Sequence, residues 1–426
     1  MHHPDHFTNT FYQSTAPSAA GSALQENLEC EVCIIGAGFA GLATALGLLE
    51  RGVSNIVLLE AEQAGHGASG RNGGFVFGGF SLDNGELLKQ LGRAPARHLY
   101  QLTLDAVSLI RQRIVRYQMD CDVNDSGVLL ANWFDDERRL MQQRDFMLRE
   151  FNVDWAPWSR EQTRAALHTE RYSGALHEKN AFHFHPLKYV HGLVNVLTAQ
   201  GVRMFEQSRV IAMKTDLAEK LVRTAQGTVR AKHVVVCCGG YIDKLYPQLA
   251  RSVLPIATYV MATEKLGERL QTAMQTRAAV YDTRFAFDYY RPLADSRLLW
   301  GGRIAIRERA PREVARLLQG DMLKVYPQLA GTQVEFAWSG IMSYARHKMP
   351  QIGCLPNGVW YAMGFGGHGV APTTLAGEVV AQAIAEGRQL PSGLQNYDLR
   401  YGFGKLGLAA AQCAYWYYEL RDFLRE

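Results

Sequence analysis

The order of apolar and polar positions near the start of the chain predicts a β-α-β unit. Residues 31–35 form a short apolar run typical of a buried strand, residues 39–51 are rich in Ala and Leu at helical spacing, and residues 56–59 form a second apolar run. Parallel strands need a crossover connection, and a helix between two short strands supplies one. The sequence therefore predicts a parallel sheet of the α/β type.

Further along the chain, the pattern predicts helices and strands in both halves, with no repeat and no long linker. Helices are expected over residues 87–117, 135–150, 374–386 and 406–424, strands over 201–210, 234–238 and 359–362, and hairpins at Gln226-Gly227 and near Asp295-Ser296. The last helix is apolar nearly all round, which predicts that it packs on the body of the protein or on a partner subunit. Strand and glycine signals recur in separated segments, so two interleaved domains are expected rather than two sequential ones.

The composition is that of a soluble globular protein. Of 426 residues, 47% are hydrophobic and 20% are charged, which argues against a disordered chain. The net charge of +4 is too small to indicate a nucleic acid or an anionic membrane as a partner. The longest apolar run, residues 30–49, is interrupted by four glycines, and the N-terminal stretch has no secretory signal pattern. A cytoplasmic protein without a membrane span is therefore expected.

The cysteines and histidines do not indicate a metal. The seven cysteines are odd in number and scattered, which favours a reducing compartment over a disulfide framework. Cys30 and Cys33 form a C-x-x-C, but both lie in a predicted strand, where a buried structural role is the simpler interpretation. His183 and His185 alone are weak evidence for a ligand pair. No metal site is expected.

The strongest local motif is Gly36-Ala37-Gly38-Phe39-Ala40-Gly41, a G-x-G-x-x-G that follows the first predicted strand and opens the helix. In such a motif the first glycine makes a tight turn, the second lets the backbone reach a pyrophosphate, and the third lets the helix pack closely on the strand. The helix N-terminus then presents N–H groups to the phosphates. Glu60 ends the second strand, where a carboxylate can accept hydrogen bonds from a ribose hydroxyl. A dinucleotide site is predicted here.

Two more glycine-rich segments accompany this motif. Residues 65–74 read Gly-His-Gly-Ala-Ser-Gly-Arg-Asn-Gly-Gly, and small residues in such number can form a backbone-lined cradle for an extended dinucleotide. A flexible surface loop is the alternative interpretation. Residues 364–370 read Gly-Phe-Gly-Gly-His-Gly-Val and stand just before a predicted helix.

With these motifs the chain resembles the D-amino acid oxidase-like superfamily of FAD-dependent oxidoreductases, and within it the gamma-glutamylputrescine oxidase-like group. Further matching segments are 185–189, 288–291, 297–302, 338–340 and 349–353. The resemblance extends over residues 28–420. It implies an α/β (α+β overall) fold, in which a Rossmann-like FAD-binding domain is interleaved with a mostly antiparallel β-sheet substrate domain.

The resemblance also implies how the chain is divided. The expected segments are a flexible N-terminal lead (1–28), three FAD-binding parts (29–80, 176–250 and 339–390), a helical and substrate-side segment (81–175), a substrate-domain sheet (251–338) and a C-terminal helix (391–426).

Contacts to FAD are implied from several parts of the chain. The first glycine motif would hold the pyrophosphate, and residues 68–74 would pass under the pyrophosphate and the flavin edge. Val210 would meet the adenine, and residues 366–370 would meet the flavin edge. The expected cofactor-binding residues are Gly36, Gly38, Phe39, Ala40, Gly41, Glu60, Ala61, Gly67, Ala68, Ser69, Gly70, Arg71, Asn72, Gly73, Gly74, Val210, Gly239, Gly240, Gly340, Gly366, Gly367, His368, Gly369 and Val370. Relatives with a covalent flavin carry a Cys before the last strand. Residues 241–353 contain none, so non-covalent FAD is expected.

The substrate side departs from the amino-acid-oxidising relatives. They place a Lys that grips the substrate carboxylate where this chain has Ala371, which favours an amine with its charge elsewhere. Tyr289, Tyr290 and Trp300 are expected to line an aromatic approach to the flavin, and ordinary core packing is the alternative. The candidate catalytic residues are His368, Tyr290 and Arg71, although a histidine beside a flavin is more often a structural hydrogen-bonding residue.

The expected activity is oxidation of an amine C–N bond by FAD, giving an imine and then an aldehyde, with O2 reduced to H2O2. The expected substrate is γ-glutamylputrescine or a related alkyl amine in polyamine catabolism. A dehydrogenase of the same fold that passes electrons to a quinone or another carrier is an alternative, and a binding module without turnover is a third. The expected partners are a small-molecule amine and O2, with no nucleic acid, and assembly into a homodimer is left open.

Overall fold

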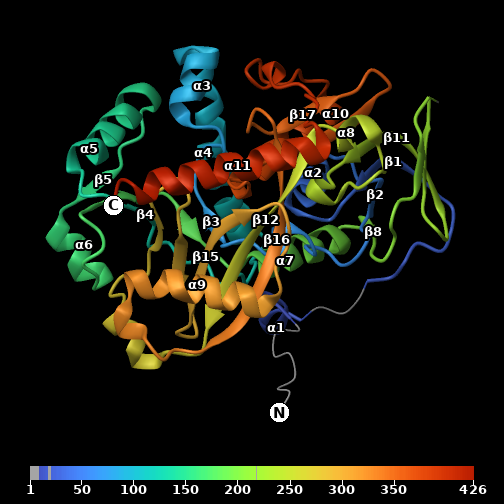
Figure 1. The fold of residues 1–426 in the computed structure, drawn as a ribbon. Helices are drawn as coiled ribbons and strands as arrows, with labels where there is room; N and C mark the ends of the chain where they lie inside the picture. The colour runs from blue at the N-terminus through green and yellow to red at the C-terminus, as the bar shows by residue number, and fades with distance from the viewer. Residues whose placement is uncertain (1–8, 18–20, 217) are drawn as a thin grey trace.

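Two eight-stranded sheets dominate the structure, and each gathers strands from distant parts of the chain. The computed structural model describes residues 9–17, 21–216 and 218–426. In Figure 1 the first sheet lies on the right, with β1, β2, β8 and β11, and the second lies nearer the centre, with β12, β15 and β16 above α9. The arrangement confirms the predicted fold class, since a parallel sheet and a mostly antiparallel sheet alternate along the chain.

The first sheet contains the predicted β-α-β unit. Its main path is β17-β18-β11-β1-β2-β8, in which β18, β11, β1, β2 and β8 run parallel, while β17 at one edge and the β9–β10 extension are antiparallel. The strands are β1 (Leu28–Ile35), β2 (Ile56–Leu59), β8 (Arg203–Phe205), β9 (Ala212–Lys214), β10 (Lys220–Arg223), β11 (Thr228–Val236), β17 (Gln351–Cys354) and β18 (Val359–Met363). The carboxyl ends of the parallel strands therefore lie along one edge.

Helices cover this sheet, with α2 (Phe39–Leu49) and α10 (Val370–Glu386) packed against each other. α2 is buried on all sides except near its end, which explains why its sequence lacks a polar face. The two helices approach closely at Gly377, where a Cβ would stand 2.6 Å from Ala43. α4 (Arg93–Arg116) packs on α10, and α7 (Pro186–Ala199) packs on α2.

The second sheet has the order β16-β12-β15-β14-β13-β4-β6-β5, and its neighbours are antiparallel except β13 and β4. Its strands are β4 (Val128–Ala131), β5 (Ala156–Trp158), β6 (Ala175–Glu178), β12 (Val253–Thr263), β13 (Ala279–Asp282), β14 (Tyr289–Pro292), β15 (Leu298–Ala305) and β16 (Val334–Ala345). The hairpin predicted near Asp295-Ser296 joins β14 to β15. α9 (Pro311–Val325) packs on β12, β15 and β16, and a small sheet pairs β3 (Phe75–Val76) with β7 (Phe182–His183).

Several element boundaries differ from the sequence expectation. The helix predicted over 87–117 is two helices, α3 (Asn84–Leu91) and α4, because Gly92 has a φ of 79° between them. The predicted FAD-binding part from residue 176 would divide β6, and the part from residue 339 would divide β16, although both strands belong to the second sheet. Four further helices after residue 130 are α5 (Glu137–Phe146), α6 (Arg160–Leu167), α8 (Pro247–Ala250) and α11 (Gly404–Phe423), with a π turn at Met147–Phe151.

The prediction of a flexible N-terminal lead is wrong for part of its length. α1 (Phe11–Thr15) begins with a Thr10 capping box, and Tyr12 is completely buried. The Tyr12 hydroxyl donates to the Asn72 carbonyl over 2.8 Å and accepts from the Arg291 guanidinium over 3.3 Å. Residues 1–8 and 18–20 lie outside the described residues. This segment is thus attached to the glycine-rich loop by specific contacts that carry no sequence signature.

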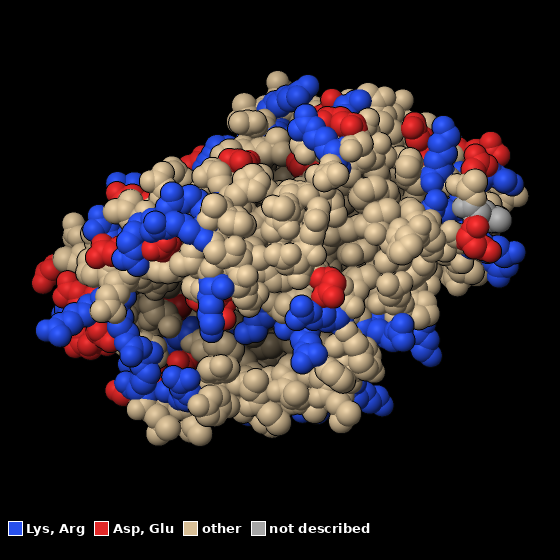
Figure 2. Space-filling view, turned by 90° about the horizontal axis from the view of Figure 1, so that it is seen from above, with Lys and Arg blue, Asp and Glu red and all other residues tan. Residues whose placement is uncertain are grey.

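The C-terminal helix α11 is only partly packed on the body. It contacts β12, and Tyr415 is its one buried residue among those described. Packing on the body, one of the two predicted alternatives, is therefore limited, and packing on a partner subunit stays a prediction. Its exposed side chains include five large apolar or aromatic ones, Leu406, Trp416, Tyr417, Leu420 and Phe423, beside the charged Lys405 and Arg421. Within the described ranges, no helix is long and apolar enough to cross a membrane. On the face in Figure 2, Lys and Arg are mixed with Asp and Glu, and uncharged residues cover most of the centre.

Candidate cofactor and active site

The first glycine motif forms the tight turn between β1 and α2. The Gly36 N–H donates to the Leu59 carbonyl over 2.8 Å, and the Cys237 N–H donates to the Ile35 carbonyl over 2.8 Å, which brings the ends of three strands together. Gly36 has a φ of 105°, and a Cβ there would lie 2.8 Å from the Cys237 carbonyl oxygen. Only glycine meets both demands at this turn.

The N-terminus of α2 contacts the second glycine-rich segment. The Phe39 N–H at the helix N-terminus donates to the Ser69 hydroxyl over 2.9 Å, and a Cβ at Gly38 would lie 2.9 Å from the same hydroxyl. Gly41 lies against the Gly36 carbonyl, where a side chain would have no room. Gly38 and Ser69 therefore lie side by side at the N-terminus of this helix, which is the kind of position that binds a phosphate group.

Glu60 lies at the end of β2, beside this turn. Its carboxylate accepts hydrogen bonds from the Ala37 N–H over 2.7 Å and from the Glu62 N–H over 3.0 Å. Burial raises the pKa of Glu60, and these two N–H groups act against the increase. Ala61 follows at the same strand end. The acidic group is thus fixed next to the pyrophosphate turn, where the sequence predicts a ribose contact.

The second glycine-rich segment is folded on itself by Asn72. Its side-chain amide donates to the Ala68 and Ser69 carbonyls over 3.0 and 2.8 Å, and its oxygen accepts from the Gly74 N–H over 2.8 Å. A Cβ at Gly73 would lie 2.6 Å from the Tyr289 ring. These contacts show an ordered cradle and exclude the alternative of a flexible surface loop.

Arg71 connects this cradle to the second sheet. Its guanidinium donates to the His66 carbonyl over 2.8 Å and to the Ser339 carbonyl over 3.3 Å. Its own carbonyl accepts from the Trp338 indole over 2.9 Å, close to Gly340 on β16. These bonds give Arg71 a positioning role, whereas a catalytic role stays a prediction.

The third glycine-rich segment leads into α10 and carries His368. Gly366 has a φ of 64°, and the His368 N–H donates to the Ser81 hydroxyl over 3.1 Å. The His368 ring packs on Phe77 with 4.1 Å between ring centres, and its Nε2 lies 3.4 Å from the Phe77 carbonyl. Burial lowers the pKa of His368 to about 4, so the imidazole is neutral at neutral pH.

The adenosine end of the predicted site follows β8 and β11. Val210 is buried but lies beyond β8, because this strand ends at Phe205 and the predicted strand over 201–210 is shorter in the structure. Gly239 has a φ of 55°, and a Cβ at Gly240 would lie 2.8 Å from Ile341. The remaining predicted contacts, Ala40, Gly67, Gly70, Gly367, Gly369 and Val370, belong to the three glycine-rich segments described above.

The positions of the three glycine-rich segments and the polar groups beside them are compatible with bound FAD. Three glycine-rich segments and the end of β11 come together at one sheet edge, and side chains at Gly36, Gly38 or Gly73 would fill the space between them. A helix N-terminus and a fixed carboxylate at the same edge provide the donors for phosphate and the acceptor for ribose. The described part of the chain contains no cluster of three or more metal-binding side chains.

The two neighbouring tyrosines of β14 face opposite sides of the second sheet. Tyr290 is fully buried, stacks on Trp300 with 4.2 Å between ring centres, and bonds the hydroxyls of Tyr172 and Tyr326. This cluster lies in a core separate from the glycine-rich loops, so the predictions that Tyr290 is catalytic and that Trp300 lines the approach are wrong. Alternation along the strand explains the difference. Tyr289 does face the cradle, at Gly73 and Phe75.

Sequence reasoning assigned no contacts to several residues on the cradle side, although Arg291 belongs to the matching segment 288–291. Arg291 is buried and donates to the Gly73 carbonyl over 2.6 Å, and Phe77 and Tyr281 stack with 5.6 Å between ring centres. Glu178 is a buried carboxylate on β6. Their positions follow from strand register in a sheet assembled from distant segments, for which single residues give no signal.

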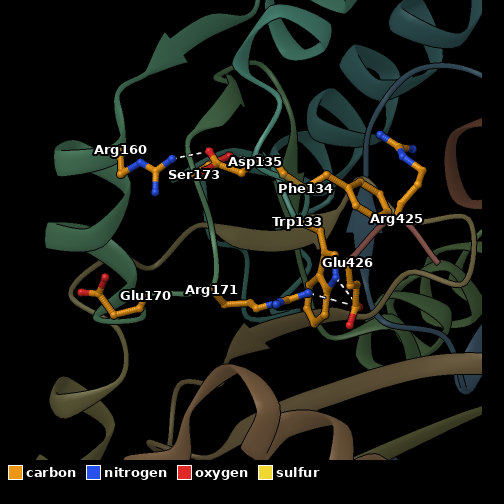
Figure 3. Close-up of a pocket in the computed structure, with 9 residues that line it drawn as sticks. All are labelled: Trp133, Phe134, Asp135, Arg160, Glu170, Arg171, Ser173, Arg425 and Glu426. Carbon is orange, nitrogen blue, oxygen red and sulfur yellow. Dashed lines mark hydrogen bonds and ion pairs between the residues drawn. The ribbon is translucent and has the colours of Figure 1, made fainter. Parts of the chain in front are cut away.

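A separate surface hollow of about 190 Å³ lies at the far end of the second sheet, shown in Figure 3. There the Trp133 indole donates to the Glu426 carboxylate over 2.6 Å, and Arg171 forms an ion pair with the same carboxylate over 3.1 Å. Arg160 pairs with Asp135 at the rim. The hollow contains none of the predicted cofactor residues, and its arginines at Arg160 and Arg171 are already paired with carboxylates.

Comparisons with known proteins identify the family of the chain and its fold. The family of FAD-dependent oxidoreductases (DAO) matches residues 31–383. Gamma-glutamylputrescine oxidoreductase of Escherichia coli is 35% identical and covers 98% of this chain and 99% of its own, and a probable oxidoreductase, OrdL, of Haemophilus influenzae is 32% identical over 89% and 88%. Glycine oxidase from Geobacillus kaustophilus matches the structure with a TM-score of 0.74 at 19% identity, covering 88% of this chain and 99% of that chain. The predicted resemblance is confirmed.

Proposed function

We propose that this chain, which belongs to the FAD-dependent oxidoreductase family, holds FAD without a covalent link and oxidises the C–N bond of an alkyl amine. The product would be an imine, which water converts to an aldehyde, and O2 would receive the electrons and become H2O2. The relative named gamma-glutamylputrescine oxidoreductase matches nearly end to end, which supports γ-glutamylputrescine or a related amine as substrate and a place in polyamine breakdown.

Bound FAD would supply the acceptor for the hydride of the amine carbon. The protein's own part is to bind and to orient. Gly36, Gly38 and the start of α2 would hold the pyrophosphate, and Glu60 would accept hydrogen bonds from the adenosine ribose. Residues 366–370 at the start of α10 would offer N–H groups to the flavin edge, where a helix N-terminus stabilises negative charge.

His368 would act at this edge as a neutral residue. Its low pKa follows from burial, and its Nε2 is directed at the Phe77 carbonyl. A neutral imidazole adds no positive charge to the flavin pocket and repels no cationic amine. The expected role is therefore to position the loop of residues 364–370 and not to accept the substrate proton.

The observation that carries the substrate class is that neither Ala371 nor Arg291 offers a free positive charge for a carboxylate. Ala371 is buried in the first turn of α10 and supplies no charge. Arg291 lies on the cradle side of β14, but its donors already bond the carbonyls of Gly73 and Phe184 and the hydroxyl of Tyr12. An α-amino acid would leave its carboxylate without a partner here, whereas an alkyl amine would not.

Flavin reduction without O2 tests this function. The yellow holoenzyme is mixed anaerobically with γ-glutamylputrescine, putrescine, glycine, sarcosine and D-alanine, and the loss of flavin absorbance is followed. Faster reduction by an alkyl amine is expected, and the rate is expected to rise with pH because a free amine has a pKa of about 10. Faster reduction by D-alanine or sarcosine would contradict the substrate class. Rapid reoxidation by air with release of H2O2 is expected, and slow reoxidation would indicate a dehydrogenase instead.

The mode of FAD attachment has a simple test of its own. All seven cysteines are free, and none lies in residues 241–353, which supports a non-covalent cofactor and a reducing, cytoplasmic location. Acid precipitation of the holoenzyme is expected to release all of its FAD into the supernatant. Flavin fluorescence that remains with the denatured chain on a gel would contradict non-covalent binding.

A homodimer through α11 is part of this proposal. The exposed apolar side chains on the outer face of α11 would be covered by a second copy, because contiguous apolar surface of this kind marks interaction sites. The double substitution Trp416→Glu and Leu420→Glu is expected to convert a dimer to a monomer in sedimentation velocity, with FAD content unchanged. A wild-type protein that sediments as a monomer at micromolar concentration would contradict it.

A further inference from the structure

Glu178 is a buried carboxylate on the cradle side of the second sheet. It is the last residue of β6, where it pairs with Val128 of β4, which in turn pairs with Ala279 of β13. Its residue exposure is 7%, and its Oε2 is buried without a hydrogen-bond partner. A buried carboxylate oxygen without a partner is costly to folding, so it calls for an explanation outside the folded chain.

No positive charge compensates this carboxylate. Glu178 takes part in none of the ion pairs formed by residues 9–17, 21–216 and 218–426. Burial raises the pKa of Glu178 to about 7, and only the backbone N–H of Gly78 acts against the increase. A cation beside it would lower that pKa again and recover the lost solvation.

Glu178 lies next to the part of the site that the flavin edge is expected to meet. The segment 77–79 is shared: the Gly78 N–H faces Glu178, while the Phe77 carbonyl faces His368 Nε2 over 3.4 Å. A Cβ at Gly79 would lie 3.7 Å from the His368 ring. One backbone segment therefore connects the carboxylate of the second sheet to the loop that begins α10.

Aromatic rings lead from the surface to this carboxylate. Phe287 is exposed, its ring centre lies 6.0 Å from that of Tyr281, and Tyr281 stacks on Phe77 at 5.6 Å. Val128, the strand partner of Glu178, packs with Phe77 and Tyr281 in one cluster, which places both rings on the side of the sheet that carries Glu178. Aromatic faces and a carboxylate together are the groups that bind an alkylammonium ion.

We propose that the Glu178 carboxylate binds the cationic amine group of the substrate, beside the stacked rings of Phe77 and Tyr281. This site rests on the proposed amine oxidation, because the amine substrate of that reaction supplies the positive charge that the buried carboxylate lacks. It also gives a reason for the preference for amines over uncharged alcohols of the same shape. Glu178 is in this sense a specificity-determining residue.

Ligand binding without turnover tests the proposal. The probes are tert-pentylamine, whose amine carbon has no hydrogen to lose, and its neutral isostere tert-pentanol, titrated into the oxidised holoenzyme by calorimetry and flavin difference spectra. We expect the wild-type protein to bind the amine at least about tenfold more tightly than the alcohol at pH 8, which corresponds to about 1.4 kcal/mol. The same preference in Glu178→Gln would overturn the proposal.

The Glu178→Gln variant is expected to bind both probes equally and to keep its full FAD content. Glu268→Gln is the matched control, because Glu268 is exposed and lies in the short helix Gly267–Thr272, outside strands β4, β6 and β13, and it should keep the wild-type preference. If no amine reduces the flavin, the proposed oxidation fails, but the loss of amine preference in Glu178→Gln would still support the binding site. The two failures are thereby distinguished.

The pH dependence of amine binding by the wild-type protein is a second measurement. It does not depend on whether a substituted protein folds. The preference for tert-pentylamine should fall as the pH falls through about 7, where Glu178 takes up a proton. The neighbouring titratable groups do not change there: the pKa values of Tyr100 and Tyr281 are raised, and that of His368 is lowered to about 4. The amine itself stays charged to a pKa of about 10. A preference that is constant from pH 5 to 8 would contradict the assignment.

Discussion

The nucleotide side of the candidate active site is formed by main-chain groups, whereas its substrate side is formed by side chains. On the nucleotide side, the contacts are made by main-chain groups at glycine turns, as at Gly36 and Gly38. On the substrate side, they are made by side chains of the second sheet, such as Tyr289 and Arg291. Main-chain contacts require glycine and therefore leave a motif in the sequence, whereas side-chain contacts depend on which face a strand presents.

The largest effect is expected on the nucleotide side, from Gly38→Val. Its side chain would meet the Ser69 hydroxyl, which a Cβ alone already approaches to 2.9 Å, and would occupy the space for the pyrophosphate. We expect flavin content, measured by absorbance per protein, to fall below about a tenth of the wild-type value. Gly320→Ala is the matched control, because a Cβ at Gly320 meets nothing within 4 Å. A Gly38→Val protein that stays fully yellow would show that this turn does not bind the pyrophosphate.

The junction between the two sides should be sensitive to acid. His183 donates through Nε2 to the Arg277 carbonyl over 2.8 Å and accepts from Arg291, which bonds the Gly73 carbonyl of the cradle. Burial and Arg291 lower the pKa of His183 to about 3. Below pH 6.5 the unfolded chain binds a proton that the folded chain does not, so stability is full above about pH 6.5 and is lost as the pH falls toward 3.

Thermal melts across pH 4 to 8 measure this effect. In the wild-type protein, His183 is expected to contribute a loss on the order of 2 to 3 kcal/mol at pH 4. His183→Gln keeps a donor and an acceptor but does not titrate, so its Tm should fall less steeply below pH 6.5. Parallel pH curves for the two proteins would show that His183 does not titrate as a buried neutral group.

The contrast between main-chain contacts and side-chain contacts also explains how much of the fold and the site the sequence could predict. The G-x-G-x-x-G turn, Glu60 and the parallel strands were predictable, because a strand, a turn and a helix are local and the glycines have steric reasons. The burial of Tyr290 and the place of Glu178 were not, because each depends on the register of strands that are distant in sequence. A two-residue period says that Tyr289 and Tyr290 face opposite sides, but not which side meets the cradle.

The contacts of α1 with the rest of the protein could not be predicted from the sequence, for a related reason. Residues 9–17 read as a polar lead, yet Thr10 caps a short helix and Tyr12 enters the space between the cradle and Arg291. A helix of this length is not stable alone, so its formation depends on tertiary contacts. Such contacts have no periodic pattern from which they could be inferred.

The smallest expected effects compare the two faces of β14 directly. Tyr290→Phe removes the hydroxyl between Tyr172 and Tyr326 in the buried core, and leaving their hydroxyls without this partner should cost about 1 to 2 kcal/mol. The Tm should fall by roughly 1–3 °C, with flavin reduction by the amine unchanged.

Tyr289→Phe is the opposite case, because its ring meets Gly73 and Phe75 on the cradle side. Its hydroxyl bonds Thr258 and not the buried chain of Tyr172, Tyr290 and Tyr326. The Tm should therefore fall no further than in Tyr290→Phe, while the KM for the amine changes by about two- to fivefold. Steady-state kinetics and thermal melts on the two variants, prepared in parallel, separate these outcomes. If Tyr290→Phe altered the KM and Tyr289→Phe altered only the Tm, the assignment of the two faces would be reversed. The aromatic approach would then have to be sought on the side of α9.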